Sequence, residues 1–252
     1  MNTSAALTSL SKYFFAMTLV FIACAAHAQN KVVVVPMSGD DLKPLANIIT
    51  VAKANGDFND PVEALMSITD ASAANPYLVV IAPGEYTLTE RLTMKPYVNV
   101  SGSGPEVTRL LGSFASSSQT FGTVVVATSN SRIENLTIQN TGSGANMSGI
   151  YGVFSDFTVS NVHILVEGNT DGTVYGMIIR VSSWTVSDSV IESVNEGAGD
   201  SYGIYGEYAT SRLRAINTTV VAQTDPISVL GENCSFVFDS LTSISPLDSS
   251  CD

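Results

Sequence analysis

The sequence predicts an all-β fold, a single-stranded right-handed parallel β-helix in which short strands wind into stacked coils behind an N-terminal capping helix. Three observations lead to this prediction. From about residue 77, short β-branched runs are separated by Gly, Asn, Asp and Ser, and no long helical period interrupts them. The runs recur at steps of 26 and 27 residues. A period in the twenties indicates a solenoid, and the Leu-x-x-Leu-x-Leu spine of leucine-rich repeats is missing.

The repeated segments 133–138, 159–164 and 186–191 contain two kinds of position. One kind is aliphatic and is expected to stack in an inward column: Ile133, Val159, Val186 and Leu213. The other carries amide or carboxyl side chains and is expected to stack at a turn: Asn135, Asn161 and Asp188. Such side chains can bond turn backbone and one another, so we interpret this second ladder as structural.

A glycine motif recurs at the same step in another stretch of each coil. It occupies 149–151, 176–178 and 203–205, and a weaker copy is expected at 228–230. Each coil is therefore expected to hold three short strands, with six or seven coils in all. One coil buries too little apolar surface to offset the entropy of ordering it, so the coils must stack.

The first 28 residues have the organisation of a secretory signal peptide. Lys12 precedes an apolar run over 13–26, and 26–28 form a small-x-small cleavage site. The run is too short for a membrane span. We predict cleavage after Ala28 and a secreted, periplasmic or cell-surface protein, with lipidation at Cys24 as the minor alternative.

Residues 29–76 are predicted to hold an extra strand at 31–36 and the capping helix at about 61–72. Asp60 is a favourable N-cap, Pro61 suits the first helical position and Glu63 lies three residues after the cap. Val62, Leu65, Met66 and Ile68 then form the apolar stripe that would cover the first coil.

Residues 77–252 are predicted to form the β-helix and its C-terminal cap. Cys234 and Cys251 lie in this cap, and in an exported protein they are predicted to form a disulfide, the alternative being two free thiols.

Composition limits the function classes. Lys plus Arg is 11 and Asp plus Glu is 23, which gives a net charge of −12. We therefore expect no nucleic-acid partner, because that needs a basic face, and no docking on anionic membranes. No Cys/His spacing suggests zinc, and His163 alternates outward between Val162 and Ile164. No metal site or cofactor is predicted, Ca²⁺ at acidic loops being the one open possibility.

Several motifs resemble the pectin-lyase-like superfamily, and among its members the pectin methylesterases. They are Asn-Gly-Asp-Phe at 55–58, Val-Val-Ile-Ala-Pro-Gly-Glu-Tyr at 79–86, and the turn-rich stretch 95–104, with further likeness to residue 141. The resemblance implies a parallel β-helix, and in the esterases it implies two catalytic aspartates, glutamine donors and an arginine. The glutamine turns are not preserved here: 146–149 read Asn-Met-Ser-Gly and 169–172 read Asn-Thr-Asp-Gly.

Acidic residues in equivalent loops of adjacent coils give a candidate site: Glu167, Asp171, Glu196 and Asp200. Neighbouring carboxylates shift one another's pKa for acid/base work, or they bind Ca²⁺. The candidate catalytic residues are Asp171, Asp200 and Arg212. The candidate binding residues are Glu167, Glu196, Tyr175, Tyr202 and Arg180, since arginine can hold a uronate carboxylate and aromatic rings can stack on sugars. The alternative is that these are solvated acidic loops and structural aromatic stacks.

Three functions follow from this pattern. The first is a non-catalytic surface or envelope protein that binds polysaccharide or a partner along its solenoid side. The second is a pectinesterase-like hydrolase or polysaccharide lyase that acts on acidic polysaccharide. The third is a structural solenoid that self-assembles. The missing glutamine turns favour the first.

Overall fold

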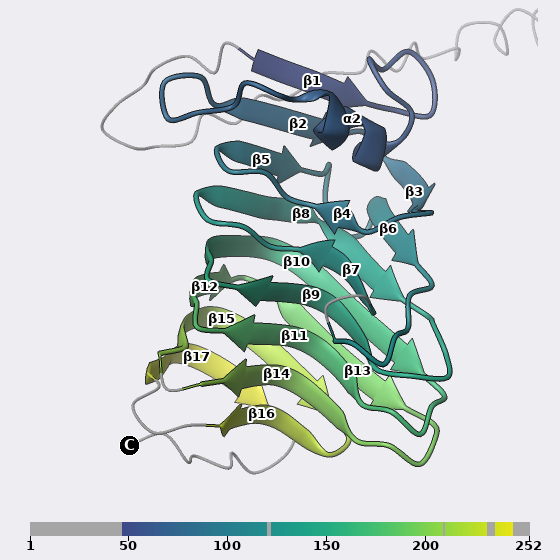
Figure 1. The fold of residues 1–252 in the computed structure, drawn as a ribbon, viewed down its shortest axis with the longest axis vertical. Helices are drawn as coiled ribbons and strands as arrows, with labels where there is room; N and C mark the ends of the chain where they lie inside the picture. The colour runs from purple at the N-terminus through teal and green to yellow at the C-terminus, as the bar shows by residue number, and fades with distance from the viewer. Residues whose placement is uncertain (1–46, 120–121, 209, 231–234, 244–252) are drawn as a thin grey trace, which may run out of the picture. The chain divides into compact units, whose positions relative to one another are not determined.

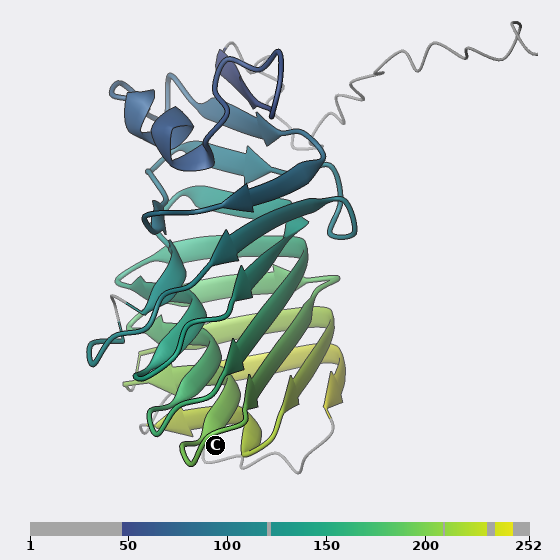
Figure 2. The same cartoon turned by 90° about the vertical axis from the view of Figure 1, so that its right-hand side faces the viewer.

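A computed structural model describes residues 47–119, 122–208, 210–230 and 235–243, which form a parallel β-solenoid of about seven coils (Figures 1 and 2). The predictions for 1–28, for the strand at 31–36 and for the pair Cys234 and Cys251 lie outside these residues. The elements are β1 (Asn47–Val51), α2 (Pro61–Ser67), β2 (Tyr77–Ile81), β3 (Gly84–Thr87), β4 (Leu92–Thr93), β5 (Val98–Ser101), β6 (Thr108–Gly112), β7 (Thr123–Val126), β8 (Ser131–Asn140), β9 (Met147–Val153), β10 (Asp156–Gly168), β11 (Val174–Arg180), β12 (Ser183–Ser187), β13 (Val190–Asn195), β14 (Ser201–Glu207), β15 (Arg212–Ala222), β16 (Asp225–Leu230) and β17 (Ser235–Ser243).

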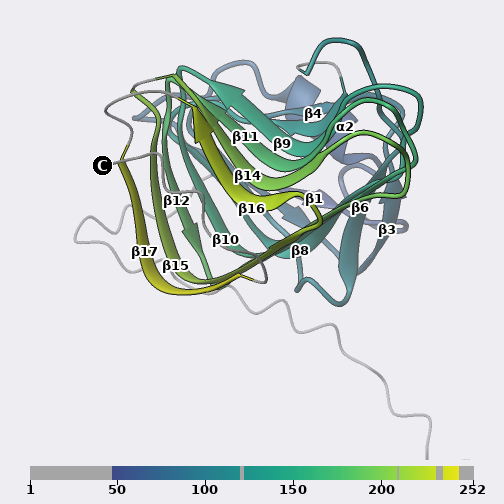
Figure 3. The same ribbon diagram turned by 90° about the horizontal axis from the view of Figure 1, so that it is seen from below.

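The strands fall into three columns, because each coil contributes three strand segments. Column I contains β1, β2, β5, β12 and the first parts of β8, β10, β15 and β17. Column II contains β3, β6, β13 and the later parts of the same long strands. Column III is a separate six-stranded sheet of β4, β7, β9, β11, β14 and β16. Figure 3, viewed along the stack, shows the columns as sides of the coil.

The corner between columns I and II is where the predicted ladder lies, and we call it the Asn corner. Its residues have positive φ: Asn135, Asn161, Asp188 and Asn217. Asn161 Nδ2 donates to Asn135 Oδ1 at 2.9 Å, and Asn217 Nδ2 donates to Asp188 Oδ1 at 2.9 Å. Asn and Asp tolerate the left-handed region better than other non-glycine residues, so one such residue makes the sharp turn in each of these coils. The structural interpretation of the ladder is confirmed.

The inward column is confirmed for three of its four predicted members. Ile133, Val159 and Val186 are in register and fully buried, but the next residue in their row is Ala215. The prediction of Leu213 was wrong, because it pairs with Trp184 instead. The turn before β15 is two residues longer than the turn before β12, so a strict 27-residue count stops two places short.

The glycine motif is explained by close packing inside the coil. A Cβ on Gly176 would lie 2.4 Å from Ile191 Cγ2 and 2.5 Å from the carbonyl oxygen of Gly203. The fourth copy lies at 226–228 rather than 228–230, since Ile227 pairs with Ile204. The loop before β16 is shorter than the loop before β14, which displaces the expected copy.

Helix α2 spans Pro61–Ser67 and is shorter than predicted. Asp60 caps it, with Oδ1 accepting the Val62 N–H at 2.7 Å. Leu65 is buried in the core cluster with Ala64, whereas Met66 is 63% exposed and does not belong to the predicted stripe. Lys95 Nζ donates to the carbonyl oxygens of Met66 and Ile68, which satisfies acceptors where the helix ends.

Candidate functional site

The outer face of column III carries an apolar and aromatic cluster that is separate from the solenoid core. We call it the tyrosine face, and it comprises Tyr151, Tyr175, Ile178, Tyr202 and Tyr205. Tyr175 pairs with Tyr202 across β11 and β14, while Tyr151, Ile178 and Tyr205 align across β9, β11 and β14. Because parallel strands place equivalent positions on the same face, the sequence repeat becomes two rows of side chains.

Three rings of the tyrosine face contact one another. Tyr175 and Tyr202 are stacked, with centroids 5.7 Å apart and ring planes 21° apart. The Tyr205 centroid lies 5.1 Å from that of Tyr175 and 5.5 Å from that of Tyr202. Ile178 is fully buried and Tyr151 and Tyr175 are nearly so, whereas Tyr202 and Tyr205 are only partly covered. The cluster therefore presents Tyr202 and Tyr205 to solvent on a base of buried side chains.

The hydroxyl groups of Tyr202 and Tyr205 remain protonated at neutral pH. Burial raises the pKa of Tyr205 to about 12, with further contributions from Tyr175 and Glu207. Burial also raises the pKa of Tyr202, and the carboxylate of Asp200 raises it further. The Tyr175 hydroxyl accepts a hydrogen bond from Gln119 Nε2 at 3.0 Å. The partly covered Tyr205 hydroxyl can thus donate a hydrogen bond to a ligand beside the rings, whereas the Tyr202 hydroxyl already donates to Asp200.

Arg180 ends β11 at one edge of the tyrosine face. Its guanidinium pairs with Glu207 on β14 and lies 5.9 Å from the Tyr151 centroid and 5.8 Å from the Tyr208 centroid. Burial acts to lower the pKa of Arg180, but hydrogen bonds to Tyr151 and Glu207 outweigh it and raise that pKa. The Arg180 guanidinium, which was predicted to bind a ligand carboxylate, is therefore already paired with Glu207.

Asp200 lies at the opposite edge of the tyrosine face. It directly precedes β14, and its Oδ1 accepts from Thr224 Oγ1 at 3.3 Å. A hydrogen bond from Tyr202 to its carboxylate contributes to the raised pKa of that tyrosine. Of the predicted acids, Asp200 is the one that the structure places against the predicted tyrosines.

Asp171 lies in the neighbouring loop but is not level with Asp200. The loops stack so that Gly199 lies on Gly172, where an added Cβ would be 1.9 Å from the Gly172 carbonyl oxygen. Asp171 is therefore level with Ala198, and Asp200 with Thr173, whose carbonyl accepts the Met147 N–H of the preceding coil. The two aspartates are offset by two positions, and Asp171 is exposed.

The remaining predicted residues lie away from this edge. Glu167 belongs to column II, where Gln139 Nε2 donates to its Oε2 at 3.0 Å, and Glu196 is exposed at the start of the next loop. Arg212 begins β15, so the whole of β14, about 20 Å of strand, separates it from Asp200. The structure thus brings together Tyr175, Tyr202 and Asp200, and leaves Arg212 on another column.

Metal ligands are not grouped in the part of the chain that the structure describes: no three His, Cys, Asp or Glu side chains lie close enough to hold an ion. His163, predicted to point outward, is half-buried, with Nε2 3.3 Å from Glu192 Oε2. Across the same residues, no helix has the length and apolar character that a membrane crossing requires.

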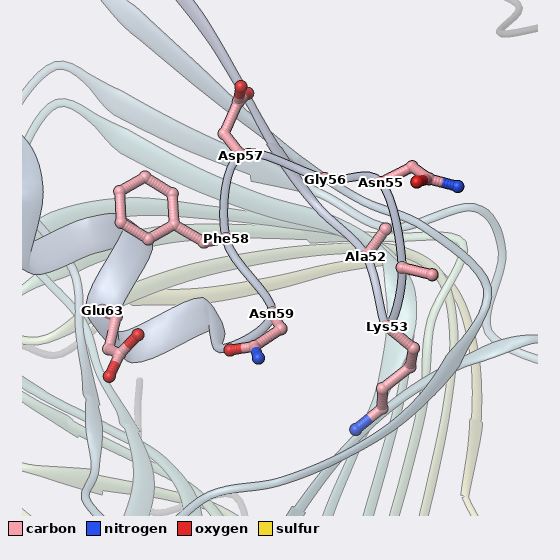
Figure 4. Close-up of a pocket in the computed structure, with 9 residues that line it drawn as sticks. Ala52, Lys53, Asn55, Gly56, Asp57, Phe58, Asn59 and Glu63 are labelled. Atoms are coloured by element: carbon pink, nitrogen blue, oxygen red, sulfur yellow. The ribbon is translucent and has the colours of Figure 1, made fainter.

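A separate open hollow of about 350 Å³ lies near the N-terminal end of the solenoid (Figure 4). Its wall is polar and is formed largely by the chain 52–59 together with Glu63 of α2. Asp57 lies here, and hydrogen bonds from the backbone and side chain of Thr50 hold the pKa of Asp57 below its usual value. These bonds close the loop locally, which accounts for the Asp in the Asn-Gly-Asp-Phe motif without a ligand.

Two features of the site escaped the sequence analysis. Gln119 comes from the loop after β6, and only the folded chain shows that it reaches Tyr175. The turn between columns III and I carries exposed apolar residues at a 27-residue step, Phe154 and Tyr208 with Val181 between them. The 27-residue step could have been detected in the sequence, but the turn conformation of these residues could not.

Comparison with known proteins gives structural likeness without sequence likeness. No protein-family model and no curated protein match this chain. Similar solved structures include a pectin methylesterase variant in complex with a hexasaccharide, which is 13% identical over 77% of this chain and 80% of that chain, with a TM-score of 0.46. The Escherichia coli protein YbhC is 10% identical over 85% and 76%, with a TM-score of 0.47. The rice weevil pectin methylesterase is 12% identical over 80% and 91%, with a TM-score of 0.43.

Proposed function

We propose that this protein is an exported, non-catalytic polysaccharide-binding solenoid that uses the tyrosine face as its binding surface. The observation that carries the proposal is the stacked pair Tyr175 and Tyr202, with Tyr205 against both, outside the core and partly open to solvent. A fold needs apolar residues inside the coil, but nothing in the coil requires rings on its outer side. Aromatic faces beside protonated hydroxyls suit the apolar face and the hydroxyl rim of a sugar ring.

The arrangement of charges supports binding rather than turnover. Asp171 and Asp200 are offset by two positions, Arg212 lies beyond the far end of β14, and Arg180 is engaged by Glu207. A pair of catalytic carboxylates must both reach the reacting atoms of one bound substrate. Of the two aspartates, Asp200 is the one placed against the tyrosine face, and Arg212 lies beyond the far end of β14.

The net charge of −12 also favours a neutral polysaccharide over a polyuronate. Asp200 adjoins Tyr202, and Asp225 adds to the raised pKa of the same tyrosine, so the rim of the face is itself acidic. A polyanion would be repelled there unless cations such as Ca²⁺ bridged the two. Export is part of the proposal, with the N-terminal 28 residues as its signal and cleavage after Ala28.

The test is retention of the purified protein on insoluble neutral polysaccharides and on demethylated and methylated pectin, with and without Ca²⁺. We expect retention on a neutral polysaccharide, weakened about tenfold in Tyr202→Ala and in Tyr205→Ala, because each removes a stacking ring. Tyr205→Phe keeps the ring and isolates the hydroxyl, and Tyr77→Ala on column I is the matched control. Methanol release or unsaturated products that disappear in Asp200→Asn would instead establish the enzymatic alternative.

A further inference from the structure

The turn between columns III and I, which we call the apolar corner, breaks two ordinary rules at once. Its turn residues Phe154, Val181 and Tyr208 have φ of 51°, 47° and 73°. Positive φ is uncommon for residues other than Gly, Asn and Asp, and for a β-branched residue it is an outlier. Phe154 is also 75% exposed and Tyr208 is 54% exposed. The corner therefore combines a strained backbone with exposed apolar side chains, a combination found at functional surfaces.

The backbone does not need these residues. Buried serines behind the corner satisfy its hydrogen bonds: Ser182 Oγ accepts the Ser155 N–H at 3.0 Å, and Ser211 Oγ accepts the Val181 N–H at 3.0 Å. None of the three belongs to the core cluster, and the Tyr208 ring lies 5.8 Å from the Arg180 guanidinium of the same chain. The exposed surface of Phe154 and Tyr208 is thus available for a contact from outside.

Register places charged residues symmetrically beside the apolar ones. Asp156, Ser183 and Arg212 are aligned in one row across three successive coils. Phe154 lies in the coil of Asp156, Val181 in that of Ser183, and Tyr208 in that of Arg212. The middle coil is thus flanked by an aromatic residue and an acid on one side, and by an aromatic residue and a base on the other.

We propose that the apolar corner is a homodimer interface in which two copies pack antiparallel about a two-fold axis running along the coil of Val181 and Ser183. A two-fold axis in that position places Phe154 of one copy against the Tyr208 coil of the other copy. It likewise places Asp156 of one copy against the Arg212 coil of the other. Each contact occurs twice. Val181 and Ser183 meet their own counterparts on the axis.

Charge explains why a second copy fits better than another partner. Asp156 and Arg212 are exposed, and among the described residues neither belongs to an ion pair within its own chain. They lie two strand spacings apart, about 10 Å, too far for a direct pair but correctly placed to pair across the axis. With Arg180 and Glu207, the corner carries two acids and two bases on a chain of net charge −12. Two acidic molecules approach one another most easily through such a neutral region.

The test measures the dimer dissociation constant by sedimentation of the purified protein and its charge variants. Asp156→Arg and Arg212→Asp each place like charges together twice, and we expect each to weaken self-association about a hundredfold. Mixing these two variants should restore association, because arginines at 156 and 212 of one copy then face aspartates of the other. The double variant should also dimerise.

Two further variants separate the apolar contact from its alternatives. Phe154→Asn suits the positive φ and should weaken the dimer at least about tenfold while the monomer stays folded. Glu196→Arg makes the same charge change as Asp156→Arg away from the corner, and it should leave the dissociation constant unchanged. A protein that is monomeric at all concentrations overturns the proposal, as does failure of the mixed variants to associate. Loss of polysaccharide retention in Phe154→Asn without any change in association would assign the corner to the glycan and also overturn it.

Discussion

The two corners that flank column I meet the same backbone requirement with opposite residues. In the three coils that begin with β10, β12 and β15, each corner has one residue of positive φ. At the Asn corner, that residue has an amide or carboxyl side chain, which tolerates the conformation and bonds its counterpart in the next coil. At the apolar corner, the residue is Phe, Val or Tyr, and it makes no equivalent bond to its counterparts.

The difference lies in where the polar side chain sits. At the apolar corner, Ser155, Ser182 and Ser211 are buried directly behind the turn, and Ser155 and Ser182 have their Oγ atoms 3.3 Å apart. Because this second ladder of serines bonds the turn, the outward residue does not have to supply that hydrogen bond. The backbone conformation alone therefore accounts for the residues of the Asn corner. It does not account for the residues of the apolar corner, which call for a functional explanation.

The largest expected effect is the loss of stability on making the Asn corner resemble the apolar one. Asn161→Val places a β-branched residue at φ 52° and removes the bond to Asn135. Strain and the lost hydrogen bond together should lower the free energy of unfolding by about 2–3 kcal/mol. Urea unfolding followed by circular dichroism measures this. Asn161→Gly keeps the conformation and should cost less than Val, and an unchanged midpoint for Val would contradict the structural role of the ladder.

The reciprocal change should have the opposite sign and a smaller size. Val181→Asn relieves a β-branched residue at φ 47°, and the bond from the Val181 N–H to Ser211 is kept because it involves only backbone on this side. We expect the free energy of unfolding to rise by about 1 kcal/mol. The measurement is the same urea titration at a concentration where the protein is monomeric. A less stable variant would show that the Val181 side chain has a packing role that outweighs its strain.

The sequence predicted those parts of the fold that depend on a repeated physical constraint. The glycine motif was visible because any side chain at Gly149, Gly176 or Gly203 would collide with the opposite strand. The Asn ladder was visible because Asn is the usual non-glycine choice for that conformation. Register failed where turn length changed, so that Leu213 was placed in the row that Ala215 occupies.

The candidate site was predicted only in part, because a linear repeat does not fix which loop residues are level. That Tyr175 and Tyr202 lie side by side could be predicted, since equivalent strand positions must share a face. Asp171 and Asp200 were taken as equivalent although stacking of Gly199 on Gly172 offsets them. The apolar corner was missed because propensity rules place Gly or Asn, not Phe or Val, at positive φ.

The smallest effect concerns the tyrosine face, which lies between the apolar corner and the acidic loops, and it is visible only at high pH. The pKa of Tyr205 is about 12 in the folded protein against an ordinary value of 10.0, mainly through burial. Because the folded state favours the neutral phenol, this group contributes stability that is complete below pH 10.0 and is lost as the pH rises through about 12. Tyr205→Phe cannot ionise at this position, so its unfolding midpoint should be close to that of the unmodified protein at neutral pH and should fall less between these limits.

Tyr208→Phe removes an exposed hydroxyl and should instead follow the unmodified protein throughout. Parallel loss of stability in Tyr205→Phe and the unmodified protein would mean that the Tyr205 ring is more open to solvent than its contacts with Tyr175 and Tyr202 indicate.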